Sequence, residues 1–196
     1  MNNMIATIEL NWPFRNVIVV VGIALLVTIL IHSVFAAVTS KKQCNARRGW
    51  IAALVYFAFA ILVIGLTATS FGAILVEGVM QNWALLAHIS IAGAFVFVML
   101  VFAIIWNPNY LAQTGSGAIP VEASKKDRWW LFTWSLWGVL FSSVVVAGSM
   151  LLQMLPVLDT EGMLEVTELH RYSGLVLSVS LILNVYSIAI RRIGWR

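Results

Sequence analysis

Apolar residues fall in five long blocks separated by short polar segments, not in the short alternating segments of a β-barrel. The blocks cover about residues 17–39, 50–76, 83–106, 129–155 and 169–190. Each is near or above the ~20 residues that an α-helix needs to cross ~30 Å of hydrocarbon. The prolines lie outside the blocks or at their ends, so the helices should be largely unbroken. The pattern predicts an all-α integral membrane protein, with residues 1–196 forming a single bundle of about five transmembrane helices.

Composition supports a surface that faces lipid. Hydrophobic residues make up 61% of the chain and charged residues only 10%, against roughly 25% charged in a typical soluble domain. The net charge of +4 does not indicate nucleic acid binding, because the basic residues form short clusters between apolar blocks. Cys44 is the only cysteine. This excludes an internal disulfide, a Cys-rich iron–sulfur motif and covalent attachment of haem through Cys-x-x-Cys-His.

The distribution of charge predicts the orientation in the membrane. Ten of the twelve Lys and Arg residues follow the first block, precede the fourth or follow the fifth, and only Arg15 and Arg171 fall on the other side. The positive-inside rule therefore places the N-terminus outside and the C-terminus in the cytoplasm. The predicted outer side carries most of the acidic residues, several of them in a predicted loop at 156–168: Glu9, Glu77, Asp159, Glu161, Glu165 and Glu168.

Two of the three histidines are expected at the same depth in the membrane. His88 lies about five residues into the third apolar block, and His170 lies in the first turn of the fifth. Both blocks run from outside to inside, so the two imidazoles can face each other across a haem iron. His32 lies about fifteen residues into the first block, roughly 20 Å deeper, and cannot share that iron. Each histidine alone would more often form a hydrogen bond between helices.

Residues near this pair suit a porphyrin and its propionates. Gly93 and Gly174 follow His88 and His170 by about one turn, where a missing side chain opens space for the ring. Arg171 can bind a propionate through its guanidinium group. Small or hydroxylated residues of the second and fourth blocks can flank the ring: Gly65, Thr67, Gly72, Ser142, Ser143 and Gly148. Such residues also serve simply to bring transmembrane helices close together.

The segments Leu85–His88 and Glu168–Leu175 (Glu-Leu-His-Arg-Tyr-Ser-Gly-Leu) carry a family resemblance. They resemble the haem-ligating helices of small bacterial membrane cytochromes b, the group that includes the membrane subunits of formate dehydrogenase, hydrogenase and respiratory nitrate reductase. The likeness is clearest over about residues 80–190. It implies an electron-transfer subunit of an inner-membrane oxidoreductase complex, with non-covalent haem b held by His88 and His170. It also implies transfer of electrons between a membrane quinone pool and a partner subunit.

The chain departs from the two-haem members of this group. These commonly repeat a histidine about fourteen residues along each ligand helix, where this chain has Phe102 and Asn184. Neither is a normal haem ligand, so the sequence predicts one haem b. His32 could belong to a quinone pocket or a proton path on the inner side, but we favour a hydrogen bond to a neighbouring helix. We detect no internal repeat in the sequence.

Other functions remain open at this point. The chain could be a cofactor-free structural anchor of a respiratory or photosynthetic complex, since a missing second histidine pair can mean that all cofactors are lost. A transporter or metal permease would need charged groups near the middle of the membrane, and the apolar blocks supply none. An enzyme acting alone is disfavoured, because the sequence has no paired carboxylates in a plausible cleft, no catalytic triad and no phosphate-binding loop. A periplasmic redox protein could dock on the acidic segment 156–168.

Overall fold

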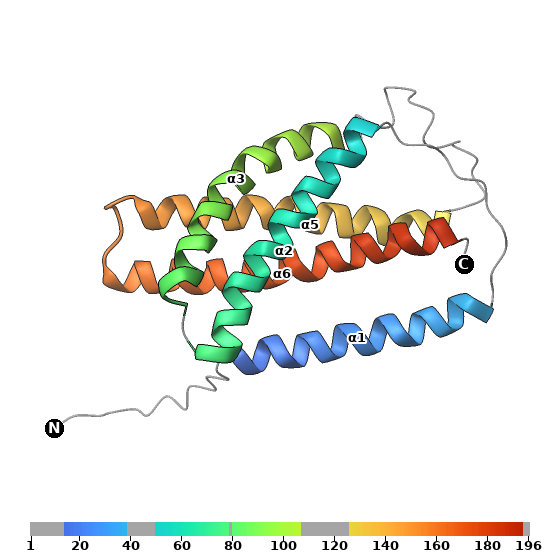
Figure 1. Cartoon of the computed structure of the whole chain (residues 1–196), viewed down its shortest axis with the longest axis horizontal. Coiled ribbons are helices and arrows are strands. Elements are labelled where there is room, and N and C mark those ends of the chain that lie inside the picture. The colour runs from blue at the N-terminus through green and yellow to red at the C-terminus, as the bar shows by residue number, and fades with distance from the viewer. Residues whose placement is uncertain (1–13, 39–49, 79, 107–125, 194–196) are drawn as a thin grey trace.

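The computed structural model describes residues 14–38, 50–78, 80–106 and 126–193 (Figure 1). Within these ranges all regular structure is helical: α1 (Phe14–Val38), α2 (Trp50–Glu77), α3 (Asn82–Trp106), α5 (Lys126–Met154) and α6 (Thr160–Ile193). All five helices are long and apolar enough to cross a membrane, as backbone groups in hydrocarbon require. The predicted helical fold class is confirmed, and the chain is a multi-pass membrane protein.

The start of α6 corrects the sequence prediction. The last helix was expected to begin near residue 169, but it begins at Thr160, so most of the predicted acidic loop at 156–168 is helical. Asp159 caps this helix, because its Oδ1 accepts a hydrogen bond of 2.9 Å from the backbone N–H of Gly162. The prediction followed hydrophobicity alone and therefore missed the polar turns that precede the apolar part of α6.

Tight connections join the helices into two antiparallel hairpins. Gly78 follows α2 with a φ of +80°, and its N–H donates to the carbonyl of Ile74 at 3.2 Å, a helix C-cap that favours glycine. Asn82 also has a positive φ of 53° where α3 begins. After α5, Pro156 cannot continue the helix, and the chain turns directly into α6. The first hairpin is thus α2/α3, and the second is α5/α6.

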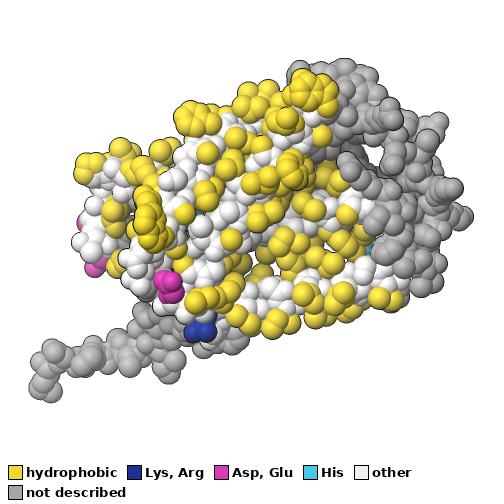
Figure 2. Space-filling view, viewed as in Figure 1, with side chains coloured by type: hydrophobic (Ala, Val, Ile, Leu, Met, Phe, Trp, Pro, Cys, Tyr) yellow, Lys and Arg dark blue, Asp and Glu magenta, His cyan; other side chains and the backbone are white. Residues whose placement is uncertain are grey.

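The α2/α3 hairpin crosses over the α5/α6 hairpin, and α1 lies beside α2 and α6 (Figure 1). The two hairpin turns lie toward the same end of the molecule. Figure 2 shows acidic side chains gathered there, on the left of the view. Where the structure describes side chains, all the charged ones belong to the first turn of α1, the end of α2 and residues 159–171. We call this the acidic end of the bundle.

Helix α1 contacts the bundle near its two ends and is otherwise exposed. Ile18 packs with Phe71 and Leu175 near the acidic end, and His32 contacts Tyr186 near the other end. Between them, large apolar side chains such as Ile23 are more than half exposed. Exposed apolar side chains on this scale suit contact with lipid rather than with water.

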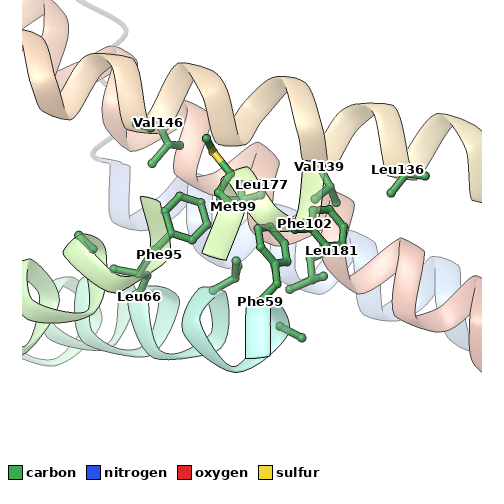
Figure 3. Packing of buried hydrophobic residues seen from close by; sticks show 14 of the residues in the cluster. Phe59, Leu66, Phe95, Met99, Phe102, Leu136, Val139, Val146, Leu177 and Leu181 are labelled. Carbon is green, nitrogen blue, oxygen red and sulfur yellow. The ribbon is translucent and has the colours of Figure 1, made fainter. Parts of the chain in front are cut away.

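A packed apolar core extends from the middle of the bundle into the half away from the acidic end (Figure 3). The rings of Phe59 and Phe102 stack with centroids 4.2 Å apart and planes 11° apart. Asn184 is 1% exposed; its Oδ1 accepts from the Tyr56 hydroxyl and its Nδ2 donates to Ser135 Oγ, both at 3.0 Å. Side chains therefore fill the space around Phe102 and Asn184, where a second haem would need its ligands.

Substitution of Asn184 by leucine should destabilise the bundle by about 1–3 kcal/mol, because it removes the acceptor of the half-buried Tyr56 hydroxyl and the donor to the buried Ser135 hydroxyl. The measurement is denaturant unfolding of the detergent-solubilised protein. The matched control is Val185→Ala, which alters a neighbouring side chain that is 43% exposed and should change stability by less than about 0.5 kcal/mol. Equal effects of both substitutions would contradict the assigned role of Asn184.

Candidate functional site: a histidine pair between two hairpins

The imidazole rings of His88 on α3 and His170 on α6 lie in a T-shaped contact near the acidic end. Their ring centroids lie 6.5 Å apart, and their planes are inclined at 78°. The sequence prediction that these two side chains come together is confirmed. His170 lies in the third turn of α6 and not in the first turn, because the helix begins at Thr160.

Each imidazole is held by a hydroxyl group from the other helix of its own hairpin. His88 Nδ1 lies 3.0 Å from Thr69 Oγ1 on α2, and His170 Nδ1 lies 3.0 Å from Ser149 Oγ on α5. Sequence reasoning missed both hydroxyl residues. Metal-binding histidines usually engage their second ring nitrogen in a hydrogen bond of this kind, and no described side chain forms a hydrogen bond with either Nε2.

The two hairpins repeat this arrangement in nearly the same register. The hydroxyl residue precedes its histidine by 19 residues in one hairpin and by 21 in the other. Buried residues then follow each histidine at the same spacings of seven, eleven and fourteen residues: Phe95, Met99 and Phe102 on α3, and Leu177, Leu181 and Asn184 on α6. The packing repeats although the residue types do not. A hydroxyl residue about twenty positions before each histidine was the available signal.

A small cavity of about 60 Å³ lies beside the histidine pair, with mainly apolar residues around it. Gly174 lines the cavity, and a Cβ atom added there would meet nothing within 4 Å. Gly93 is exposed and does not line it. The reason is helical geometry, because four residues after a histidine return to the same face and five do not. The small residue on the face of His88 is Ala92, which lines the cavity.

Arg171 lies at the same cavity with a partly exposed side chain. Its Nη1 lies 2.7 Å from Glu168 Oε1, in an ion pair one turn apart on α6. Exposed pairs of this type contribute little to stability, so the guanidinium group remains available to another anion. Among the described side chains, Gln153 Nε2 is buried without a hydrogen-bonding partner. It lies one turn along α5 from Ser149, toward the acidic end.

His32 is not part of this site. Its Nδ1 lies 2.8 Å from the hydroxyl of Tyr186, and Tyr186 lies sixteen residues along α6 from His170, roughly 24 Å away. The favoured prediction for His32, a hydrogen bond to a neighbouring helix, is confirmed.

The site offers two protein ligands to a metal. No three His, Cys, Asp or Glu side chains gather anywhere in the described part of the chain. A pair of imidazoles suits a cofactor that brings its own equatorial ligands.

Comparison with known proteins gives no match. No family model matches the chain, and neither a curated protein nor a solved structure matches it. The function of the site must therefore be inferred from the geometry of the histidine pair and of the residues around it.

Proposed function

We propose that the chain is a membrane-embedded haem b electron-transfer subunit with His88 and His170 as the axial ligands of one non-covalent haem. The spacing of the two rings carries the proposal. Metal–imidazole bonds of ~2.0–2.1 Å on both sides of a metal, with roughly 1 Å more from each nitrogen to its ring centre, give centroids roughly 6 Å apart. The observed separation is 6.5 Å.

The surroundings suit a porphyrin after a local adjustment. The cavity of about 60 Å³ is smaller than the ~300–1,000 Å³ of most cofactor pockets, so side chains must move when the ring enters. Met150 lines the cavity, and its unbranched side chain adapts easily to a new shape. Gly174 and Ala92 present little bulk beside the histidines. The site lies between two hairpins that make most of their helix contacts internally.

The acidic end offers partners for the propionates. Arg171 can bind a carboxylate in a bidentate manner, and its ion pair with Glu168 can be exchanged at little cost. The unpartnered Gln153 Nε2 is a further donor on α5. Both groups lie on the side of the histidine pair nearer the outer surface predicted from the charge distribution.

Bound haem supplies one-electron redox chemistry, and the chain sets its potential through ligands, burial and nearby charge. A single haem near one surface suits exchange of electrons between a quinone pool or membrane partner and a redox protein near the periplasmic face. The likeness of Leu85–His88 and Glu168–Leu175 to bacterial membrane cytochromes b supports this role in the inner membrane. The packed core around Asn184 supports a count of one haem.

The test is a reduced-minus-oxidised absorbance spectrum of the purified protein, together with a pyridine haemochrome assay. We expect a Soret band, a reducible α band and one haem b per chain. A colourless protein with native helix content would reject the cytochrome proposal. The cofactor-free membrane anchor of a respiratory or photosynthetic complex would then be the better explanation.

Acidic residues on the first turns of α6 form a docking surface in this proposal. Glu161, Glu165 and Glu168 recur at spacings of four and three residues, which places them on one helix face, and all three are exposed. Asp159 lies just before them at the helix cap. A cationic redox partner would be attracted to this surface, which lies at the same end as the histidine pair.

Neutralisation of this surface by Asp159→Asn, Glu161→Gln and Glu165→Gln should slow electron exchange with a small cationic redox protein by roughly tenfold at low ionic strength. Asparagine preserves the helix cap. The rate should be measured by stopped flow, and the difference should vanish near 1 M salt, where the screening length is ~3 Å. Glu77→Gln, at the end of α2, is the control. An unchanged rate at low salt would remove the docking surface from the proposal.

A further inference from the structure

The direction of the hydrogen bonds at the histidine pair follows from the hydroxyl groups that hold it. Each hydroxyl has a single hydrogen to donate. Thr69 Oγ1 lies 2.8 Å from the carbonyl oxygen of Gly65 and 3.1 Å from that of Leu66. Ser149 Oγ lies 2.9 Å from the carbonyl oxygen of Val146. Since a carbonyl only accepts, each hydroxyl donates its hydrogen to the backbone and keeps its lone pairs for the imidazole.

The opposite arrangement is unfavourable on both sides of the site. If the hydroxyls donated to Nδ1, both neutral rings would carry their hydrogen on Nε2. No side chain described in the structure accepts a hydrogen bond from either Nε2. Two N–H groups would then lack side-chain acceptors beside a mainly apolar cavity, and an unpaired buried donor costs about 1–3 kcal/mol.

We propose that Thr69 and Ser149 are positioning residues that hold both imidazoles as the Nδ1-protonated tautomer, so that two Nε2 lone pairs are available before any cofactor binds. This extends the proposed haem function by naming the groups that prepare its ligands. The tautomer itself does not depend on haem, because the hydroxyl groups that set it belong to the chain. It is also the reverse of the tautomer that predominates for neutral histidine in water.

The experiment is nitrogen-15 NMR of the full-length chain in lipid, labelled at histidine and prepared from haem-deficient cells. We expect His88 and His170 to show protonated Nδ1 and unprotonated Nε2. Thr69→Val and Ser149→Ala should each shift the tautomer of their own histidine and leave the other unchanged. Ser143→Ala is the matched control, because Ser143 bonds the carbonyl of Val139 in the same way but contacts neither histidine.

Protonated Nε2 in the unsubstituted chain would overturn the inference even if the protein binds haem. Conversely, the expected tautomers in a chain that never binds haem would support the inference and reject the proposed function. If a variant folds poorly without haem, the haem-loaded protein gives a second readout. The midpoint potential should rise in Thr69→Val and Ser149→Ala, because loss of the Nδ1–H bond makes the ligand less basic. An unchanged potential in both variants would contradict the assigned role.

Discussion

Substitution of either His88 or His170 by alanine should remove essentially all haem from the protein. Loss of a residue that merely supports a ligand weakens metal binding by ~10–100-fold, so loss of an axial ligand should exceed ~100-fold. The two rings come from different hairpins, and each hairpin positions only one of them. The measurement is haem per chain by pyridine haemochrome in His88→Ala and His170→Ala, with helix content followed by circular dichroism.

His32→Ala is the control for this experiment, because His32 lies near the opposite end of the bundle and bonds Tyr186. It should retain one haem per chain with an unaltered Soret maximum. Full haem content in His88→Ala or in His170→Ala would contradict the bis-histidine site. If His32→Ala lost its haem while His88→Ala and His170→Ala stayed red, the haem would lie near Tyr186, at the opposite end of the bundle from the proposed site.

The apolar blocks were sufficient to predict five helices, because hydrocarbon admits few other structures for an isolated apolar segment. The pairing of His88 with His170 was also predictable, since depth follows directly from the number of residues along a helix. The start of α6 was not predicted from hydrophobicity, because its first turns lie beyond the apolar block and are fixed by the cap at Asp159.

Side-chain partners were harder to predict than depth. Thr69 and Ser149 lie on helices other than those of the histidines they hold, so their contacts depend on how two helices are rotated against each other. Apolar faces specify that rotation weakly when lipid is the solvent. The same limit explains Gly93, which matches Gly174 in approximate spacing from its histidine but is exposed. The sequence therefore predicted the depth of the site residues in the membrane better than the helix face on which each of them lies.

The two glycines allow a direct test of where the porphyrin lies. Gly174→Leu should fill the cavity beside His170, because a Cβ at this position has open space around it and the residue lines the cavity. The added side chain would compete with the ring, and overpacking of this kind costs ~1–3 kcal/mol. That corresponds to a loss of haem affinity of roughly tenfold to a hundredfold. Haem titration into the apoprotein, followed by the Soret band, measures the change.

Gly93→Leu is the matched control, since it adds the same side chain at an exposed position where a Cβ also meets nothing within 4 Å. Its leucine should enter lipid and leave haem affinity unchanged. Both substitutions replace glycine by a strong helix former, so neither should reduce helix content. If Gly93→Leu lowers affinity as much as Gly174→Leu, the porphyrin extends toward the exposed face of α3, and the cavity beside Gly174 is not where the ring enters. A loss confined to Gly174→Leu would place the ring between the two hairpins, next to the face of α6 that carries His170.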